Sequence, residues 1–301
     1  MANEYHDPVL LRESVNGLIA RMDGRYVDAT FGGGGHSREI LNRLGPDGRL
    51  IAFDRDADAA VNVPDDPRFT LVRSDFRWLK NHLRHLDSLP VDGILADLGV
   101  SGHQFDVPLR GFSIRSDGPL DMRMDQRAPR TAADLVADLT EGELGDLLKR
   151  FGEVQGARRV ARALVDARKV GAIRTTGRLV EVLRPLAPKR DANTFLAKVF
   201  QALRIVVNDE LGSLRELLRQ SEIVLGQGGR LVIISYHSLE DRLVKHWMRA
   251  GTEEGVEHKD VFGHPVRPFT PLTRKVIVPT EEEVMKNPRA RSARLRIAER
   301  N

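Results

Sequence analysis

The sequence predicts an α/β fold, a parallel sheet whose strands alternate with helices, with an inserted all-helical domain. Three observations lead to this prediction. Short apolar runs alternate with helical stretches over the first hundred residues, the glycine-rich segment FGGGGHS follows the first run, and a buried-strand pattern, GRLVIIS, returns later in the chain. Continuous apolar strands with helical crossovers indicate a sheet covered on both faces, which binds its ligands beyond the carboxyl ends of the strands.

Composition narrows the class of protein. A chain of 301 residues is expected to hold a main domain plus a second unit. No apolar run approaches the roughly 20 residues that a membrane span needs. The chain has no cysteine, which excludes disulfides, thiolate nucleophiles and cysteine-based zinc sites. The first residues are polar and acidic, unlike a signal peptide, so we expect a cytoplasmic protein without a membrane partner.

Acidic residues follow four successive predicted strands. We expect strands at 25–30, 49–53, 69–73, 93–98 and 229–235. The acids at or near the ends of the first four are Asp28, Asp54, Asp75 and Asp97. Solvation alone does not explain such a series, because these positions converge on one edge of a parallel sheet.

The central part of the chain has a different character. Residues 102–127 show neither strand nor helix periodicity, but they contain apolar side chains, which predicts an ordered loop acting as a lid or pocket wall. Helical patterns follow, and Thr140 with Glu143 has the spacing of a capping box. We therefore expect a first part of the main domain at 1–104, a helical substrate-recognition insertion at 105–200, and a second part at 201–301 that ends in a basic tail.

The glycine-rich segment and Asp54 together predict an adenosine ligand. Glycines let the backbone approach a ligand, and a carboxylate at the end of the next strand can accept both ribose hydroxyls. A dinucleotide fingerprint would require glycine or alanine where Ser37 or Arg38 stands. Asp28 before the glycines instead matches the first loop of methyltransferases, so the ligand expected is S-adenosyl-L-methionine.

Two further positions have both a ligand-binding and a structural interpretation. Asp75 and Phe76 are placed to recognise adenine by hydrogen bonding and stacking, although Asp75 is equally suited to cap a helix. His36 adjoins the glycine loop and is expected to contact the cofactor; the alternative is that it donates to a backbone carbonyl. No set of residues completes a metal site, so we expect no metal.

Basic residues are concentrated in two segments. Residues 151–190 contain ten Lys and Arg against three acids, and residues 286–301 contain six against one. Such local excesses suggest contact with a polyanion, while solvated helix faces are the alternative. The cations expected to follow a phosphate backbone from one helix are Arg158, Arg159, Arg162, Arg168 and Lys169.

Six long motifs resemble one family. FGGGGHS, DLGVS, RGFSIRSDGPLDMRMD, FQALRIVVNDEL, ISYHSLEDR and NPRARSARLRIAER are together similar to the bacterial 16S ribosomal RNA cytosine-N4 methyltransferases, the MraW family. The resemblance runs from His6 to the C-terminus. It implies a Rossmann-like class I methyltransferase sheet, S-adenosyl-L-methionine as cofactor, and 16S rRNA in the small ribosomal subunit as partner. The chain departs from the family pattern at Gly102, His103 and around Lys198, which affects the shape of one pocket loop.

The resemblance also implies the site residues. Its cofactor contacts fall on Gly34, Gly35, His36, Asp54, Phe76, Asp97 and Gln104. Asp97 is expected to serve the pocket where cofactor and target amine meet. Tyr236 and His237, after the last predicted strand, are expected to hold an extruded base. The alternative is that Tyr236 packs inward while Ser238 and Glu240 cap a helix.

Other functions remain open at this point. A Rossmann oxidoreductase is disfavoured by Ser37 and Arg38, and neighbours in sequence such as His237 and Ser238 cannot form a hydrolase triad. An RNA-binding module without catalysis would leave Asp54 and Asp97 unexplained. DNA methylation is the closest alternative, because it uses the same chemistry.

Overall fold

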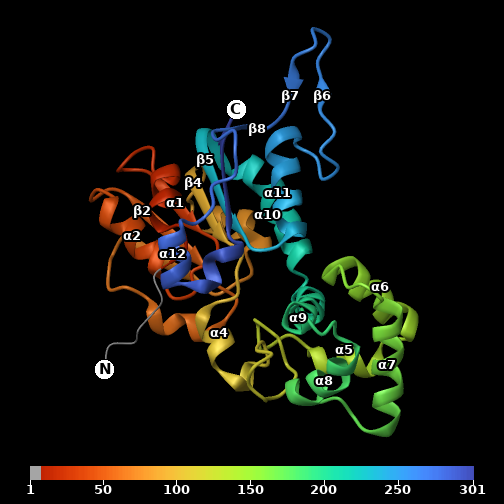
Figure 1. Cartoon of the computed structure of the whole chain (residues 1–301). Coiled ribbons are helices and arrows are strands. Elements are labelled where there is room, and N and C mark those ends of the chain that lie inside the picture. The colour runs from red at the N-terminus through yellow and green to blue at the C-terminus, as the bar shows by residue number, and fades with distance from the viewer. Residues whose placement is uncertain (1–7) are drawn as a thin grey trace. The chain divides into compact units, whose positions relative to one another are not determined.

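The computed structural model describes residues 8–301, and the chain divides into two compact units (Figure 1). One unit combines the segment up to Gly99 with Leu211–Asn301, and the other is Val100–Glu210. The second unit is therefore longer at both ends than the predicted insertion, whose boundary at residue 200 falls inside helix α9 (Ala192–Asn208). Residues 1–7, which include His6 and the first part of the polar N-terminal segment, lie outside the described residues.

The first unit is built on a seven-stranded sheet of strand order β3-β2-β1-β4-β5-β9-β8. Five strands are parallel to one another: β1 (Arg25–Asp28), β2 (Arg49–Phe53), β3 (Phe69–Val72), β4 (Val91–Asp97) and β5 (Leu225–Ser235). Strands β9 (Arg294–Arg300) and β8 (Phe269–Pro271) are antiparallel. The predicted Rossmann-like α/β class is confirmed, and the two antiparallel strands were not predicted.

Helices cover both faces of this sheet. On one face lie α1 (Leu11–Leu18) and α2 (Gly35–Arg43); on the other lie α3 (Leu79–His85), α10 (Glu210–Val224) and α11 (Ser238–Ala250). In β5, Leu231 and Ile233 pack on the second face while Val232 and Ile234 pack on the first. This alternation explains why the run GRLVIIS is apolar throughout: both faces of the strand are buried.

The end of the expected basic C-terminal tail is part of the sheet, because Arg294–Arg300 form β9. Leu295 and Ile297 point into the core, while Arg296 on the opposite face makes a two-pronged contact with Asp241 (2.8 and 3.2 Å). Arg294 joins the same carboxylate at 3.0 Å. Arg294 and Arg296, two of the basic residues that suggested a polyanion contact, therefore form ion pairs within the protein, and these pairs join β9 to the start of α11.

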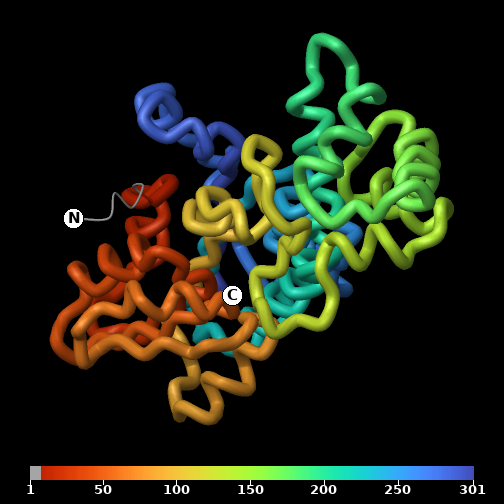
Figure 2. Tube along the Cα trace, turned by 90° about the horizontal axis from the view of Figure 1, so that it is seen from below, coloured from red at the N-terminus to blue at the C-terminus, as the bar shows by residue number. Residues whose placement is uncertain are grey.

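Segments distant in sequence meet elsewhere in the first unit. Helix α12 (Glu281–Lys286) lies near the start of α1, where Leu10 N donates to Glu283 Oε1 at 2.7 Å (Figure 2). Short strands β6 (His258–Lys259) and β7 (Pro265–Val266) form a separate hairpin. The remaining 3₁₀ turns of this unit are η1 (Ala57–Asn62), η2 (Phe76–Trp78) and η5 (Pro288–Ser292).

The second unit is all-helical, as predicted. Its helices are α4 (Gly102–Asp106), α5 (Ala132–Asp138), α6 (Glu141–Gly152), α7 (Ala157–Val170), α8 (Thr176–Leu183) and α9, with 3₁₀ turns η3 (Pro108–Arg110) and η4 (Arg184–Leu186). The predicted capping box of Thr140 and Glu143 begins α6. In the described part of the chain, no helix combines the length and apolar character needed to cross a membrane.

The segment predicted as an ordered loop, 102–127, belongs to the core of the second unit. Its buried apolar side chains are Phe112, Leu120, Met122 and Met124. Asn208 holds it from α9, accepting from Met124 N at 2.8 Å and donating to the Met122 carbonyl at 2.7 Å. The segment is ordered, as expected, but it begins with helix α4, and its lid function stays a prediction.

Candidate active site

A glycine turn connects the end of β1 to α2. Gly32 and Gly34 have φ angles of 50° and 73°, in the left-handed region that favours glycine. A Cβ atom at Gly34 would lie 2.9 Å from the Phe31 ring, and one at Gly35, the first residue of α2, would lie 2.1 Å from Pro8. At Gly32 a Cβ atom would meet only the Thr30 carbonyl, at 3.9 Å, so the backbone is open there, next to the N–H groups that begin α2.

Asp54 follows β2 and faces this turn. Its Oδ2 accepts from Gly32 N at 2.7 Å, and its Oδ1 accepts from Asp56 N at 2.8 Å. Desolvation by burial raises the pKa of Asp54 to about 6, against the opposing effect of these two backbone donors. Each carboxylate oxygen has a further lone pair, so the group that shapes the glycine turn can also accept hydroxyls.

The structure separates the roles predicted for Asp75 and Phe76. Asp75 caps η2 by accepting from Arg77 N at 2.9 Å, and its other oxygen accepts from Arg55 and Ser213 at 2.9 and 3.0 Å. The capping alternative is confirmed for Asp75, whose two oxygens are both engaged by the protein. Phe76 is half-buried on the edge of the core, and its stacking on adenine stays a prediction.

Asp97 is the last residue of β4 and has an oxygen available. Its backbone N–H donates to Thr30 Oγ1 at 2.7 Å, which joins the ends of β4 and β1. Oδ2 lies 4.0 Å from His36 Nδ1, whereas Oδ1 is buried without a hydrogen-bond partner among residues 8–301. Desolvation raises the pKa of this carboxyl, against the smaller opposing effects of His36, the Tyr236 phenol and the Gly99 N–H. A desolvated acceptor of this kind is unfavourable unless a ligand satisfies it, so Asp97 is the clearest candidate for a catalytic group.

His36 sits between two acids below the turn. Its Nε2 lies 3.2 Å from the Val9 carbonyl and its Nδ1 faces Asp97, so both ring nitrogens face protein groups. Asp28 is buried, accepts from Ser37 Oγ at 2.6 Å, and has its pKa raised by desolvation, which the charge of His36 opposes. The alternative in which His36 meets a backbone carbonyl is therefore present in the structure, and its contact with a cofactor stays a prediction.

Tyr236 follows β5 and is directed inward. A Cβ at Gly99 would lie 2.7 Å from its ring, so glycine is needed where the two loops cross. Burial, and then the negative charge of Asp97, raise the pKa of Tyr236 well above its usual value. The phenol therefore stays protonated and lies beside the Asp97 carboxylate.

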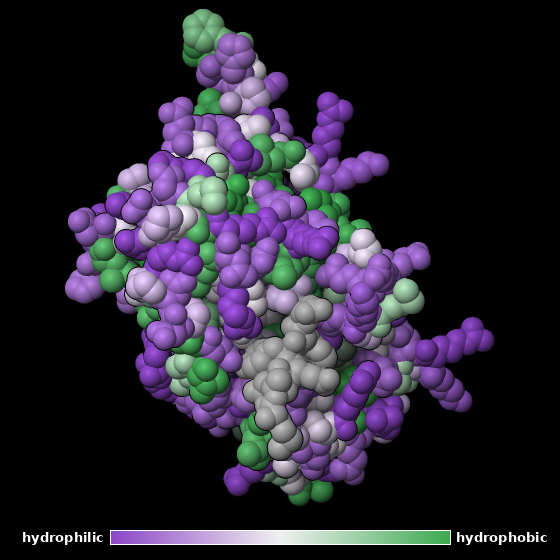
Figure 3. Space-filling model, turned by 90° about the vertical axis from the view of Figure 1, so that its left-hand side faces the viewer, coloured by the Kyte–Doolittle hydropathy of each residue, from purple (hydrophilic) through white to green (hydrophobic). Residues whose placement is uncertain are grey.

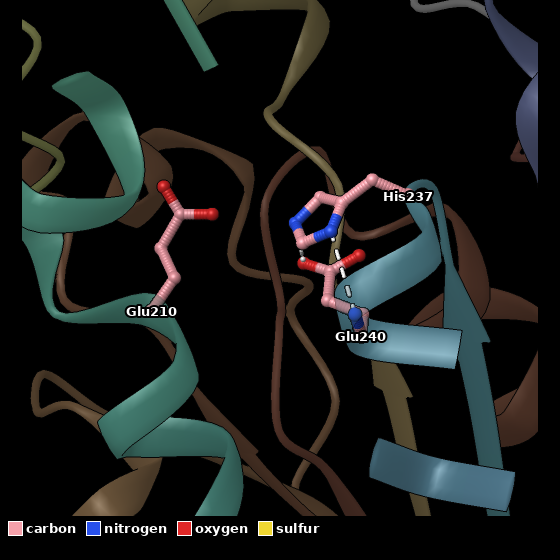
Figure 4. A group of neighbouring side chains, drawn as sticks. All are labelled: Glu210, His237 and Glu240. Carbon is pink, nitrogen blue, oxygen red and sulfur yellow. Dashed lines mark hydrogen bonds and ion pairs between the residues drawn. The ribbon is translucent and has the colours of Figure 1, made fainter. Parts of the chain in front are cut away.

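His237 is the N-cap of α11, which corrects the capping alternative based on Ser238. Its Nδ1 accepts from Glu240 N at 3.4 Å (Figure 4), and the Glu240 carboxylate accepts from Tyr236 N at 3.0 Å. His237 Nε2 lies 3.1 Å from Glu240 Oε1 in poor hydrogen-bonding geometry and is buried without another partner among the described residues. The inward alternative is therefore observed, and base contacts by Tyr236 and His237 stay predictions.

Gln104 belongs to the second unit, contrary to the predicted domain boundary. It is buried at the start of α4, where it forms a capping box with Ser101. Its contact with a cofactor stays a prediction, as does the expectation that no metal takes part.

The predicted basic helix exists as α7, but its cations are not equivalent. Arg158, Arg159 and Arg162 are exposed, although Arg159 also donates to the Leu186 carbonyl at 3.0 Å; Arg168 is half-buried and donates to the carbonyls of Val136 and Leu139 at 2.6 and 2.7 Å. Arg168 therefore closes the end of α5, and its expected phosphate contact is corrected to a structural role. The solvent-exposed group remains suited to a polyanion.

Sequence reasoning missed Thr30 and Ser37 as parts of the site. Thr30 fixes the main chain of Asp97, and Ser37 satisfies Asp28. A hydroxyl directly after the first predicted strand, and another in the first turn of the next helix, were the available signals.

The observed residues fit a bound S-adenosyl-L-methionine. Open backbone at Gly32 leaves room for the methionine moiety, Asp54 offers acceptors for ribose, and the unpartnered oxygen of Asp97 offers an acceptor at the same edge of the sheet. Asp54 and Asp97 are acidic, which suits a ligand whose sulfur carries a positive charge.

Comparison with known proteins yields a consistent set of relatives. The profile of the MraW methylase family matches residues 3–301. The chain is 57% identical over 297 residues to "Ribosomal RNA small subunit methyltransferase H" of Parabacteroides distasonis, covering 98% of this chain and 97% of the relative. Relatives of the same name from Bacteroides thetaiotaomicron and Cytophaga hutchinsonii are 54% and 53% identical, each across 98% of this chain and 97% and 99% of their own lengths.

Proposed function

Because the chain belongs to the MraW methylase family, whose members transfer a methyl group from S-adenosyl-L-methionine, we propose that it methylates the exocyclic N4 amine of a cytidine in 16S rRNA of the small ribosomal subunit. The observation that carries the proposal is the unpartnered, buried Oδ1 of Asp97 beside the glycine turn. The relatives' names specify the ribosomal RNA of the small subunit, and the exposed cations of α7 suit such a polyanion.

The cofactor, when bound, supplies an electrophilic methyl group on a positively charged sulfur. The protein's part is to hold a poor nucleophile, since the lone pair of the cytosine amine is delocalised into the ring. Asp97 Oδ1 accepts an N–H of that amine and aims its remaining lone pair, and the carboxylate stabilises the positive charge that develops on nitrogen. Alignment to a near-attack distance supplies several kcal/mol, so a strong base is unnecessary.

Three neighbours hold Asp97 in place for this task. Thr30 Oγ1 fixes its main chain, the Tyr236 phenol lies beside its carboxylate, and His36 Nδ1 lies 4.0 Å from Oδ2. The proton released by the amine leaves to water or through Asp97, whose desolvated carboxylate has a raised pKa. Asp54 and the glycine turn hold the methyl donor.

The test is methylation with labelled S-adenosyl-L-methionine, offered separately to small ribosomal subunits, protein-free rRNA and DNA. We expect label in the RNA of the subunit pool and N4-methylcytidine after digestion to nucleosides. Label in DNA alone would replace the RNA assignment. Binding of a nicotinamide dinucleotide without S-adenosyl-L-methionine binding would overturn the enzyme class.

A further inference from the structure

The hairpin of β6 and β7 projects from the first unit and has no core of its own (Figure 1). Every residue from 256 to 266 is exposed. Four of them are apolar: Val256, Val261, Phe262 and Val266, with exposed fractions of 58%, 93%, 81% and 58%. The projection at the top of Figure 3 carries hydrophobic surface at its end. Isolated exposed apolar residues are ordinary, but four within eleven residues of one projection indicate a contact surface.

The tip of the hairpin has a defined conformation. Asp260 Oδ1 accepts from the backbone N–H groups of Phe262 and His264, both at 2.9 Å, and Gly263 adopts a φ of 87°. The rings of Phe262 and His264 are neighbours, with centroids 6.5 Å apart. The turn therefore presents an aromatic side chain outward, which reduces the entropy lost when a partner binds it.

The hairpin has equal numbers of acidic and basic residues, but its two cations are not paired with its acids. Asp260 is engaged by the turn, and Glu257 pairs with Arg249 at 3.0 Å. Lys259 and Arg267 have no acidic partner among residues 8–301. An exposed ring between unpaired cations is the combination that binds single-stranded nucleic acid, where bases stack on aromatic side chains and phosphates meet Lys and Arg.

The hairpin lies at the edge of the sheet opposite to the candidate active site. Its base is tied to the end of β9, where Asn301 N donates to the Pro268 carbonyl at 3.0 Å and Asn301 Nδ2 donates to the Arg267 carbonyl at 2.7 Å. The antiparallel register pairs Glu299 with Arg230, at the far end of β5 from Ser235. The strand between Arg230 and Ser235 spans roughly 17 Å, so a partner of the hairpin that also reaches Asp97 must be large.

We propose that this hairpin is a second RNA-binding element, at which the Phe262 ring stacks on an unpaired base and Lys259 and Arg267 contact phosphates, in a part of the small-subunit RNA remote from the target cytidine. The inference rests on the proposed function, because it assumes that RNA is the substrate. A contact so far from Asp97 contributes to substrate binding without changing the geometry of methyl transfer. It also gives an assembled subunit an advantage over a short RNA.

The first test compares Phe262→Ala with wild type on small ribosomal subunits. We expect KM for subunits to rise about tenfold, the size of effect typical of a lost stacking contact, with kcat and the Kd for S-adenosyl-L-methionine unchanged. The control is Met22→Ala, which removes another exposed apolar side chain (64%) of the same unit and should leave KM unchanged. An unchanged KM in Phe262→Ala, with active wild type, overturns the hairpin proposal alone; inactive wild type on every RNA pool overturns the proposed function as well.

The second test identifies the partner directly. With p-azidophenylalanine in place of Phe262, illumination of the enzyme–subunit complex should give crosslinks to RNA. Crosslinks confined to a ribosomal protein or to a second copy of the chain would overturn the proposal, even if KM had risen. Replacing Lys259 and Arg267 by Gln should also flatten the dependence of log K on log salt, by up to about 0.7 for each lost single-strand contact.

Discussion

The two units place their charged side chains in opposite ways. In the first unit, acids gather at the strand ends, where Asp28 is buried and Asp54 and Asp97 are half-buried, each with desolvation raising its pKa. In the second unit, Arg158, Arg159 and Arg162 stand exposed on α7. A desolvated group in a fixed position acts strongly and is hard to replace, whereas exposed cations act weakly and substitute for one another. The comparison predicts large single-residue effects in the first unit and small, cumulative, salt-sensitive effects in the second.

The largest effect is expected from Asp97→Asn. The variant keeps the size of the side chain but removes the charge that aligns the amine, so single-turnover methylation at saturating cofactor should fall about 100-fold, or about 2.7 kcal/mol of transition-state stabilisation. Thermal stability should be equal or higher, because an unpartnered carboxylate with a raised pKa is unfavourable in the folded state at neutral pH.

Asp92→Asn is the matched control on the same strand. Asp92 Oδ2 accepts from Arg25 N at 2.7 Å near the start of β4, so its loss should affect the melting temperature more than methylation. If Asp97→Asn methylates at the wild-type rate, Asp97 does not serve the amine, and Tyr236 or His237 becomes the next candidate.

A smaller effect is expected from Asp54, and it depends on pH. Asp54→Ala removes charge-assisted hydrogen bonds to ribose of about 1.5–3 kcal/mol each, so the Kd for S-adenosyl-L-methionine should rise at least tenfold. In wild type the Kd should rise as pH falls through about 6, because protonation removes an acceptor. The variant should lack this pH dependence, and calorimetry at several pH values measures both effects.

In the protein without cofactor, the stability contributed by Asp54 is expected to change with pH in the opposite direction to its affinity for the cofactor. The folded-state pKa of Asp54 is raised above its unfolded value, so its contribution to the free energy of unfolding is greatest below about pH 4 and is lost as pH rises through about 6. Comparing urea unfolding of wild type and Asp54→Ala across this window isolates the contribution. A wild-type Kd that is flat with pH would show that the carboxylate does not bind the ligand as an anion.

The sheet and its glycine turn were predictable because their signals are local. An apolar run reveals a strand buried on both faces, and the step from FGGGGHS to a helical stretch reveals the turn. Strand β9 is harder to predict, because its arginines are also typical of an exposed, polyanion-binding segment. The pattern R-L-R-I nevertheless alternates with the period of two that marks a strand. Arg296 meets Asp241 only through the fold, and a sequence does not state that pairing.

The site could be predicted only in part for a similar reason. The sequence shows that Asp54 and Asp97 follow strands. Their contacts with Gly32, Thr30 and His36, which lie in other segments of the chain, depend on the fold and decide which carboxylate oxygens have partners. Asp75 illustrates the limit. Its spacing is equally good for adenine and for a helix cap, and only its contacts with Arg55 and Ser213 distinguish the two.

The smallest single-residue effects are expected on α7, where they separate exposed cations from structural ones. Replacing Arg158, Arg159 and Arg162 together by Gln should weaken RNA binding and flatten the dependence of log K on log salt by up to about one unit for each lost phosphate contact, with no change in the Kd for cofactor. Each single replacement should matter little, because Arg162 already shares its charge with Glu141 at 3.3 Å and both side chains are exposed.

Arg168→Gln should behave differently: it removes the donors to the Val136 and Leu139 carbonyls and should lower the melting temperature while leaving the salt slope unchanged. Competition binding to small ribosomal subunits between 50 and 200 mM salt (roughly the range over which such contacts are lost) supplies the slopes. A triple variant with an unaltered slope would mean that these arginines form a solvated helix face, and a triple variant as damaging as Asp97→Asn would mean that the second unit also holds groups with fixed, irreplaceable positions.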